Sequence, residues 1–287
     1  MKSTEIRTVQ SIADLRKAVN AMRQKQQTIG LVPTMGALHA GHISLVEQSV
    51  SQCDATVVSI FVNPTEFAAG EDLSEYPRPV DNDLALLAEA GVDLVFMPTN
   101  EDVYPEGSTT SLIPPAVSKK LEGESRPTHF AGVATVVLKL LNMTQPDVAY
   151  FGQKDYQQTL VVKQMVQDLN VPTRIQVCPI VRDEDGLALS SRNIYLSQQD
   201  RQAALSLIRT LNATAEMIQQ GENDGRVIMA DMTQSLIEGG VTETDYAVVV
   251  DPETLELMEI VSLPAALLVA ARVGTTRLID NMIVTAS

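Results

Sequence analysis

Two histidines in a glycine-bearing loop, His39 and His42, are the first residues of this sequence whose types and spacing could do chemistry. The loop follows an apolar run at residues 29–32, carries Gly36 and Gly41, and precedes apolar residues at helical spacing. The first turn of a helix favours anions, because its backbone N–H groups lack partners and it carries the positive end of the peptide dipole. Each imidazole can also donate a hydrogen bond to a phosphate oxygen from either ring nitrogen. This arrangement favours a site for a nucleotide triphosphate.

Two other interpretations of the histidine pair exist, a helix cap and a zinc site. A zinc site needs at least one further Cys, His or acidic ligand nearby, and the loop between residues 33 and 42 offers none. On spacing alone, the nucleotide site and the helix cap both stay open.

Three further polar loops each follow an apolar run that has the pattern of a strand. They are VNPTEF at residues 62–67, FGQKDYQQ at 151–158 and LSSRN at 189–193. Ligands of parallel sheets bind beyond the carboxyl ends of the strands, so we expect these loops to contribute to one site. Each loop also has a plainer explanation. Residues 63–64 can start a turn, residues 154–155 can be a surface ion pair, and residues 190–193 can cap a helix.

The loop sequence itself is more specific than its spacing. Residues 35–42, MGALHAGH, resemble the HxGH signature of the nucleotidyltransferase superfamily, and the preceding Pro33 and Thr34 resemble one family within it, pantothenate synthetase (pantoate–beta-alanine ligase). The tracts FVNPTEF, RPTHFAGVATVV, YFGQKDYQQ and LSSRNIYLS are similar to tracts of that family in order and approximate spacing. The resemblance extends over residues 32–280.

This resemblance implies an ATP-dependent condensation of pantoate with β-alanine to pantothenate through a pantoyl adenylate, with release of AMP and pyrophosphate. It implies that the catalytic residues are His39, His42, Lys154, Ser190, Ser191 and Arg192. The implied ATP-binding residues are Met35, Gly36, Ala37, Leu38, His39, Ala40, Gly41, His42, Gly152, Gln153, Lys154, Asp155, Val181, Leu189, Ser190, Ser191 and Arg192. The implied pantoate-binding residues are Pro33, Met35, Asn63, Glu66 and Gln158.

The resemblance also implies a role for each of these residues, and each role makes physical sense. The two imidazoles would stabilise charge on the phosphates, and His42 takes the family's role of proton donor. Lys154 would act as a mobile point charge, and Arg192 would enclose the polyphosphate together with the adjacent serines. Mg²⁺ would bridge ATP oxygens, with no protein ligands expected for it. Family members are typically homodimers.

Glu66 departs from the family, which usually has glutamine at this position. An ionised carboxylate can only accept hydrogen bonds, and it would stand near a negatively charged substrate. We expect one of three outcomes: Glu66 is protonated when pantoate binds, it turns toward a pantoate hydroxyl only, or pantoate binds weakly. The resulting hypothesis is that pantoate affinity falls steeply as the pH rises above neutrality. A second departure, Leu189 in place of a methionine, conserves volume and should matter little.

The overall composition argues against several classes of partner. The formal net charge of −15 disfavours nucleic acids and anionic membrane surfaces. The N-terminus, MKSTEIRTVQ, lacks the apolar core of a signal peptide, and no stretch reaches the length needed to span a bilayer. The two cysteines, Cys53 and Cys178, form no motif and are interpreted as core thiols in a reducing cytoplasm. We therefore expect a cytoplasmic protein.

The elements that must position these residues follow from the apolar pattern. Strands are predicted at residues 29–32, 55–62, 92–97, 148–151 and 174–181, and helices at residues 12–24, 43–50, 84–90 and 162–169. Residues 133–141 fit an amphipathic helix, although their β-branched side chains leave a strand open. The alternation predicts an α/β fold with a Rossmann-like doubly wound parallel sheet and right-handed crossovers.

The remaining residues predict a second, smaller domain. Helices are expected at residues 204–218 and 227–237, and strands at 246–250, 267–271 and 276–283, forming a small antiparallel sheet. We thus expect a nucleotide- and pantoate-binding domain at residues 1–181 and an α+β lid domain at residues 182–287. A lid has a chemical purpose, because water must be kept from a mixed anhydride.

Two rival functions stay open. One is an adenylyltransferase with the same signature that acts on a nucleotide or on phosphopantetheine, for which the tracts FVNPT and YFGQKDYQQ would have no purpose. The other is a catalytically silent member that binds nucleotide or pantoate as a sensor, for which Glu66 is the only hint.

Overall fold

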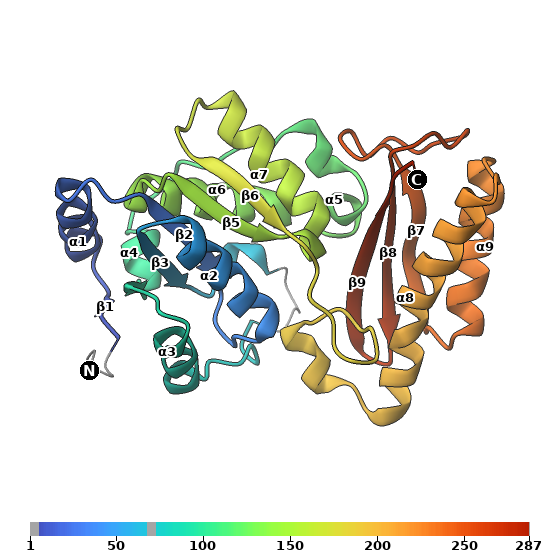
Figure 1. The fold of residues 1–287 in the computed structure, drawn as a ribbon, viewed down its shortest axis with the longest axis horizontal. Helices are drawn as coiled ribbons and strands as arrows, with labels where there is room; N and C mark the ends of the chain where they lie inside the picture. Colours follow the sequence, from blue (N-terminus) through green and yellow to red (C-terminus); the bar gives the residue numbers. More distant parts are fainter. Residues whose placement is uncertain (1–5, 68–72, 287) are drawn as a thin grey trace. The chain divides into compact units, whose positions relative to one another are not determined.

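The computed structural model describes residues 6–67 and 73–286, and the chain forms two compact units (Figure 1). The first unit comprises Met1–Gly152 and Gln157–Pro179, and the second comprises Gln153–Tyr156 and Ile180–Ser287. The short segment Gln153–Tyr156 therefore packs with the C-terminal part of the chain, although it directly follows a strand of the first unit.

A six-stranded parallel sheet forms the centre of the first unit, in the order β1-β4-β3-β2-β5-β6. The strands are β1 (Thr8–Val9), β2 (Ile29–Thr34), β3 (Ala55–Ile60), β4 (Leu94–Phe96), β5 (Val148–Gly152) and β6 (Arg174–Cys178). The order reverses direction between β2 and β5, which pair with each other at Gly30 and Val148. Ligands of doubly wound sheets bind at such a switch point, and the histidine loop follows β2 there.

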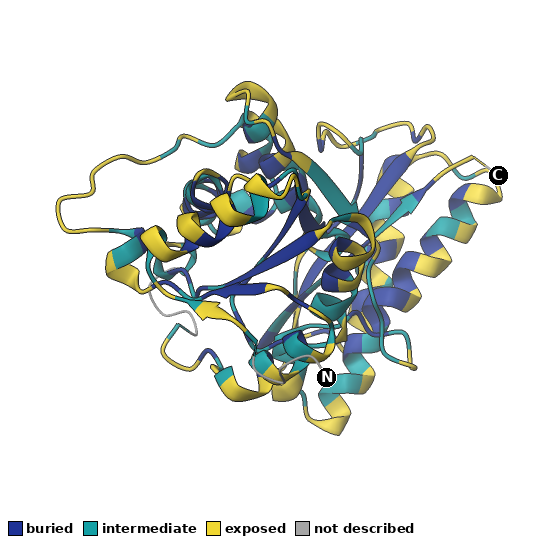
Figure 2. Ribbon diagram, turned by 60° about the vertical axis from the view of Figure 1, so that its left-hand side comes forward, coloured by how far each residue is buried: buried dark blue, intermediate teal, exposed yellow. Residues whose placement is uncertain are grey.

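Helices cover both faces of this sheet. They are α1 (Ile12–Gln24), α2 (Ala40–Gln52), α3 (Val80–Glu89), α6 (His129–Thr144) and α7 (Tyr156–Asp168), with short helices α4 (Asn100–Val103) and α5 (Glu122–Ser125) and the 3₁₀ turns η1 (Pro64–Glu66) and η2 (Ala116–Lys119). A further 3₁₀ turn, η3 (Gln153–Asp155), belongs to the second unit. Because side chains alternate along a strand, Leu31 and Val57 pack with α1, α6 and α7, whereas Val32 and Val58 pack with α2 and α3. The central strands β2, β3, β4 and β5 are accordingly mostly buried, whereas the edge strands β1 and β6 are more exposed (Figure 2).

The second unit contains two helices, α8 (Gln198–Gln219) and α9 (Gly225–Glu238), and a 3₁₀ turn, η4 (Ser191–Tyr195). Its antiparallel sheet has the order β7 (Glu243–Val250), β8 (Ala265–Val273) and β9 (Thr276–Val284). The buried side chains of α8 and α9 pack on this sheet in a separate apolar core. The predicted fold class, a doubly wound parallel sheet with a smaller α+β part, is confirmed.

Several predicted boundaries differ from the structure. The strand at 55–62 ends at Ile60, and the strand at 174–181 ends at Cys178, where Pro179 has no N–H to extend the ladder. The helix at 84–90 already begins at Val80, because acidic residues stabilise its first turn. The segment 133–141, left open between helix and strand, lies within α6. The two-residue strand β1 is too short to show a pattern in the sequence.

The helix expected from the apolar spacing at residues 43–50 is α2, but not every apolar residue on it is buried. Val50 is 41% exposed, and the buried residues of the helix are Leu45, Val46 and Ser49. Ser49 turns inward because its hydroxyl pairs with Thr56 Oγ1 at 2.8 Å.

The two cysteines form no disulfide, and Cys178 is buried while Cys53 is half-buried at the end of α2. Within residues 6–67 and 73–286, the structure contains no helix that is long and apolar enough to cross a bilayer. The N-terminal segment MKSTEIRTVQ was predicted to lack a signal peptide, and its first five residues lie outside the described residues.

Candidate active site

The two histidines form the start of α2. His39 is the N-cap residue, and its Nδ1 accepts a hydrogen bond from the Gly41 N–H at 3.1 Å. His42 reaches back, and its Nδ1 accepts from the His39 N–H at 3.3 Å. The two rings lie with their centroids 4.1 Å apart. The helix-cap explanation of the pair is therefore correct, and it does not exclude a role toward phosphate.

These bonds assign the tautomer of both rings. A ring nitrogen that accepts a hydrogen bond carries no proton, so the proton of each neutral imidazole lies on Nε2. The prediction that either ring nitrogen could donate to a phosphate is thus corrected: Nδ1 is used by the main chain, and Nε2–H is the donor. Two Nε2–H groups at the positive end of a helix are suited to donate hydrogen bonds to an oxyanion.

Asp83 on α3 holds the loop that precedes His39. Its Oδ2 accepts from the Ala37 N–H at 2.9 Å and its Oδ1 from the Leu38 N–H at 2.8 Å, and the residue is 1% exposed. The loop needs this support at Ala37, whose positive φ angle of 51° is unfavourable for a residue with a Cβ, whereas glycine readily adopts the φ of 83° found at Gly36. Burial raises the pKa of Asp83, and the two N–H donors act in the opposite direction. In the sequence Asp83 is only an acidic residue near the start of a predicted helix, so its hydrogen bonds to the histidine loop were not predicted.

The predicted pantoate residues Asn63 and Glu66 contact each other at the η1 turn. Asn63 is 1% exposed, and its Nδ2 donates to Glu66 Oε1 at 2.9 Å and to the Gly132 carbonyl at 3.4 Å. Its Oδ1 accepts from the Tyr104 hydroxyl at 2.9 Å and from the Thr65 N–H at 3.3 Å. Asn63 therefore caps the turn, as its plainer explanation required, and it also orients the Glu66 carboxylate.

Two basic residues lie beside Glu66 that sequence reasoning did not single out. The Glu66 carbonyl accepts from Arg126 Nη2 at 3.0 Å and lies 3.1 Å from His129 Nδ1, which donates to it. Both residues belong to the tract RPTHF, so the tract was noticed but its individual residues were not. Arg126 brings positive charge, and both residues bring N–H donors, to the surroundings of the unusual carboxylate.

The other predicted residues of the first unit have fewer defined contacts. Pro33 lies in β2 and Met35 follows it, Gly152 ends β5, and Gln158 lies in the first turn of α7; all four are half-buried. The neighbouring Gln157 is the structural one of the two glutamines, because its side chain is buried between main-chain groups of residues 117–122.

The second unit brings together another group of predicted residues. Ser190 caps the η4 turn and accepts from the Arg192 N–H at 3.3 Å, and the Leu189 N–H donates to the Val181 carbonyl at 3.0 Å. Residues 181 and 189 are therefore neighbours in a hairpin. Lys154 lies in η3, with its Nζ 3.9 Å from Asp155 Oδ1. The ion pair expected from the plainer explanation is therefore present at a long distance, and such a pair contributes little to stability.

The predicted site residues thus divide between the two units. His39, His42, Asn63, Glu66 and Gln158 belong to the first, whereas Lys154, Val181 and residues 189–192 belong to the second. That all of them form one site stays a prediction. In the described part of the chain, no group of three or more His, Cys, Asp or Glu side chains could hold a metal ion.

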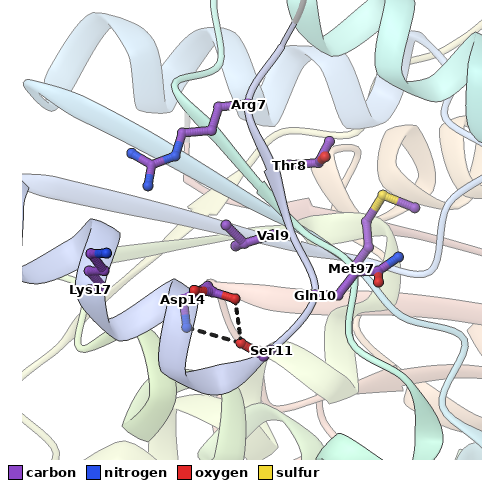
Figure 3. Close-up of a pocket in the computed structure, with 8 residues that line it drawn as sticks. All are labelled: Arg7, Thr8, Val9, Gln10, Ser11, Asp14, Lys17 and Met97. Carbon is purple, nitrogen blue, oxygen red and sulfur yellow. Dashed lines mark hydrogen bonds between the residues drawn. The ribbon is translucent and has the colours of Figure 1, made fainter.

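A cavity of about 630 Å³ lies at the edge strand β1 and the start of α1 (Figure 3). Arg7, Thr8, Val9, Gln10, Ser11, Asp14, Lys17 and Met97 line it. Asp14 and Ser11 are paired with each other there, and none of the predicted site residues is part of it. The cavity is therefore a feature separate from the histidine loop.

Sequence comparisons match this chain over nearly its whole length. Residues 7–283 match the family described as Pantoate-beta-alanine ligase. The pantothenate synthetase of Acidobacterium capsulatum is 49% identical, and the match covers 97% of this chain and 97% of that protein. The pantothenate synthetase of Chloroflexus aggregans is 50% identical over 277 residues, covering 96% of this chain and 99% of that protein.

Structural comparison gives the same result. The crystal structure of pantothenate synthetase from Thermus thermophilus superposes with a TM-score of 0.92 at 45% identity, covering 98% of this chain and 100% of that one. The pantoate-beta-alanine ligase from Francisella tularensis, complexed with beta-gamma ATP and β-alanine, has a TM-score of 0.80 at 36% identity and covers 98% and 99% of the two chains. The resemblance noted in the sequence is confirmed, and this chain belongs to the pantoate-beta-alanine ligase family.

Proposed function

We propose that this chain, which condenses pantoate with β-alanine using ATP, does so through a pantoyl adenylate. In the first step a pantoate carboxylate oxygen attacks the α-phosphorus, the bond from that phosphorus to the bridging oxygen breaks, and pyrophosphate leaves. In the second step the β-alanine amine attacks the acyl carbon, the acyl C–O bond breaks, and AMP leaves. The amine proton passes to solvent. No covalent enzyme intermediate is needed, because ATP activates the acid.

The observation that carries this proposal is the hydrogen bonding of the two imidazoles at the start of α2. Main-chain N–H groups occupy Nδ1 of His39 and His42, so both Nε2–H groups are held as donors before any ligand binds. Donors that are already oriented stabilise charge developing on a phosphate at little cost in reorganisation. His42 then donates through Nε2–H, because its Nδ1 already accepts from the His39 N–H.

We propose that the second unit supplies the charges that bind the polyphosphate. Lys154 acts as a point charge, and Arg192, with Ser190 and Ser191, encloses the phosphates. Gly152, Gln153, Asp155, Val181 and Leu189 bound the remainder of the nucleotide. The hairpin bond between Val181 and Leu189 supports this assignment, since it fixes two of these residues side by side. The Francisella tularensis relative, solved with beta-gamma ATP, supports nucleotide binding.

We propose that Mg²⁺ accompanies ATP. Phosphate oxygens and water are the ligands that this hard cation prefers, so the residues of the phosphate site, Lys154 and Arg192 among them, would surround the complex without ligating the metal. When bound, Mg²⁺ would neutralise part of the phosphate charge.

Pantoate is proposed to bind at Pro33, Met35, Asn63, Glu66 and Gln158. Because Glu66 Oε1 accepts from Asn63 Nδ2, this hydrogen bond orients the carboxylate, which would accept from a pantoate hydroxyl or carry a proton. Both arrangements would avoid direct repulsion between the two carboxylates.

We further propose that residues 1–181 bind nucleotide and pantoate, that residues 182–287 close over the reacting groups as a lid, and that the chain works as a homodimer in the cytoplasm. A lid is supported by the chemistry, because a mixed anhydride is hydrolysed if water reaches it.

An oxygen-transfer experiment tests this function. Pantoate labelled with ¹⁸O in its carboxylate, mixed with ATP, Mg²⁺, β-alanine and the protein, should give AMP that carries one ¹⁸O, together with unlabelled pyrophosphate. ADP as the product would instead indicate phosphoryl transfer, and a nucleotidyl product would indicate an adenylyltransferase of another specificity. ATP binding without turnover would favour the sensor.

A further inference from the structure

The buried amide of Asn281 on β9 makes three hydrogen bonds to the η3 turn. Its Nδ2 donates to the carbonyls of Gln153 and Lys154, each at 3.0 Å, and its Oδ1 accepts from Gln153 Nε2 at 3.2 Å. Asn281 is 2% exposed. Both donors of this amide are therefore used on two consecutive carbonyls, one of which belongs to Lys154.

Asn281 is itself fixed in place. Its own N–H donates to Asp280 Oδ1 at 2.8 Å, and Asp280 is bound by both terminal nitrogens of Arg182, at 2.6 and 2.9 Å. The residue that follows the turn, Tyr156, is also held, because its hydroxyl donates to the Pro252 carbonyl at 2.7 Å. The turn thus has contacts at both ends with the C-terminal part of the chain.

These contacts explain why the turn belongs to the second unit. Gln153 directly follows β5 of the first unit, yet Gln153–Tyr156 packs with the residues from Ile180 onward. Lys154 is therefore carried by the same compact unit as Ser190, Ser191 and Arg192. A flexible four-carbon side chain places its ammonium reproducibly only if its main chain is fixed.

We propose that Asn281 is a positioning residue for the reaction: it anchors the main chain of Lys154 to the second unit, so that the ammonium and the Ser190–Arg192 group act on the polyphosphate as one body. The proposal rests on the role in ATP binding that is proposed above for Lys154. It assigns a function to a residue more than a hundred positions away from the turn that it holds.

A double-mutant cycle tests this proposal in the full-length chain. Steady-state pyrophosphate release from ATP and pantoate, with saturating β-alanine, is measured for the wild type, Asn281→Asp, Lys154→Ala and the double variant. The aspartate retains an acceptor but loses both donors, and its charge faces two carbonyls. Because misplacement of a charged group by about 1 Å can cost a hundredfold in rate, we expect Asn281→Asp to lower kcat/KM for ATP by about 10- to 100-fold. The KM for pantoate should stay unchanged.

The diagnostic comparison is with the double variant. If Asn281 acts through Lys154, the double variant is no worse than Lys154→Ala, because coupled residues are not additive. Losses that multiply would overturn the proposal, as would a wild-type kcat/KM in Asn281→Asp. If Lys154→Ala alone behaves as the wild type, the proposed role of Lys154 fails, and the anchoring proposal fails with it.

Two further variants separate positioning from simple loss of stability. Leu278→Ala removes a buried side chain from the same strand and should lower the melting temperature without changing kcat/KM for ATP. If Asn281→Asp does not fold, Asn281→Ser takes its place in the cycle, because it introduces no charge and keeps a hydroxyl donor.

Discussion

Substitution of His42 by asparagine or by glutamine should separate its two roles. The Oδ1 of an asparagine can take the position of Nδ1 and accept from the His39 N–H, but nothing replaces Nε2–H. A glutamine is longer, and its amide N–H can approach the position of Nε2–H, but it makes the capping bond poorly. The two variants therefore test the cap and the phosphate donor one at a time.

The structure sets the expected magnitudes. The capping bond from the His39 N–H to His42 Nδ1 is long, at 3.3 Å, so its loss should cost about 0.5–1 kcal/mol, the lower part of the range for helix caps. Removal of a preorganised donor to a charged transition state typically lowers kcat by about 10²–10³, or about 2.7–4 kcal/mol. His42→Asn should therefore lose kcat with little loss of stability, and His42→Gln should lose stability but retain more activity.

The measurements are pyrophosphate release under saturating substrates and urea unfolding of the same preparations. Wild-type kcat in His42→Asn would refute the assignment of Nε2–H as the donor. Equal losses of kcat in His42→Asn and His42→Gln would also contradict this assignment, because only the glutamine can place an N–H near the position of Nε2–H.

Three other predictions concern single groups. Asp83→Asn should destabilise the fold by about 1–3 kcal/mol in urea unfolding, because it turns an amide donor toward main-chain N–H groups; it should also lower kcat. The exposed Asp81→Asn, in the same helical turn, should change stability by less than about 0.5 kcal/mol, and equal losses would count against the reasoning. Glu66→Gln should lower the KM for pantoate above neutral pH, and identical KM values across the pH range would reject a role for this charge. Burial, followed by two nearby carboxylates, raises the pKa of Tyr156 to about 12. Because an unfolded tyrosine titrates near pH 10, the stability of the wild type relative to Tyr156→Phe should be constant below about pH 10 and fall as the pH rises toward 12. A pH-independent difference would show that the hydroxyl titrates equally in both states.

The parts of the fold that were predictable are those with a local cause. The run at β3 is free of charge and rich in β-branched residues, which indicated a strand buried on both faces, and α1 matches its predicted bounds. The ends of strands were less predictable, because apolar residues continue past the last ladder bond, as Val62 does beyond Ile60. The histidine loop was recognisable because motif, glycines and helix start are contiguous.

The unpredicted parts of the site depend on contacts between distant segments. Asp83 is more than forty residues from the loop that it holds, and Asn281 is more than a hundred from Lys154. Each appears in the sequence as an ordinary polar residue within an element. Only the packing of that element shows which main-chain groups its side chain reaches. The tautomers of His39 and His42 were likewise undetermined until their hydrogen-bond donors were located.

The discontinuous second unit has a consequence for anyone who would split or recombine this protein. The chain passes from one unit to the other after Gly152, again after Tyr156 and a third time after Pro179. A gene cut at a single point near residue 180 would produce a C-terminal fragment that lacks Gln153–Tyr156. The Asn281 side-chain amide and the Pro252 carbonyl, which bind this segment, would then be exposed to water. Exchange of the C-terminal part between relatives should therefore carry this short insert along, as a second, separate piece of donor sequence.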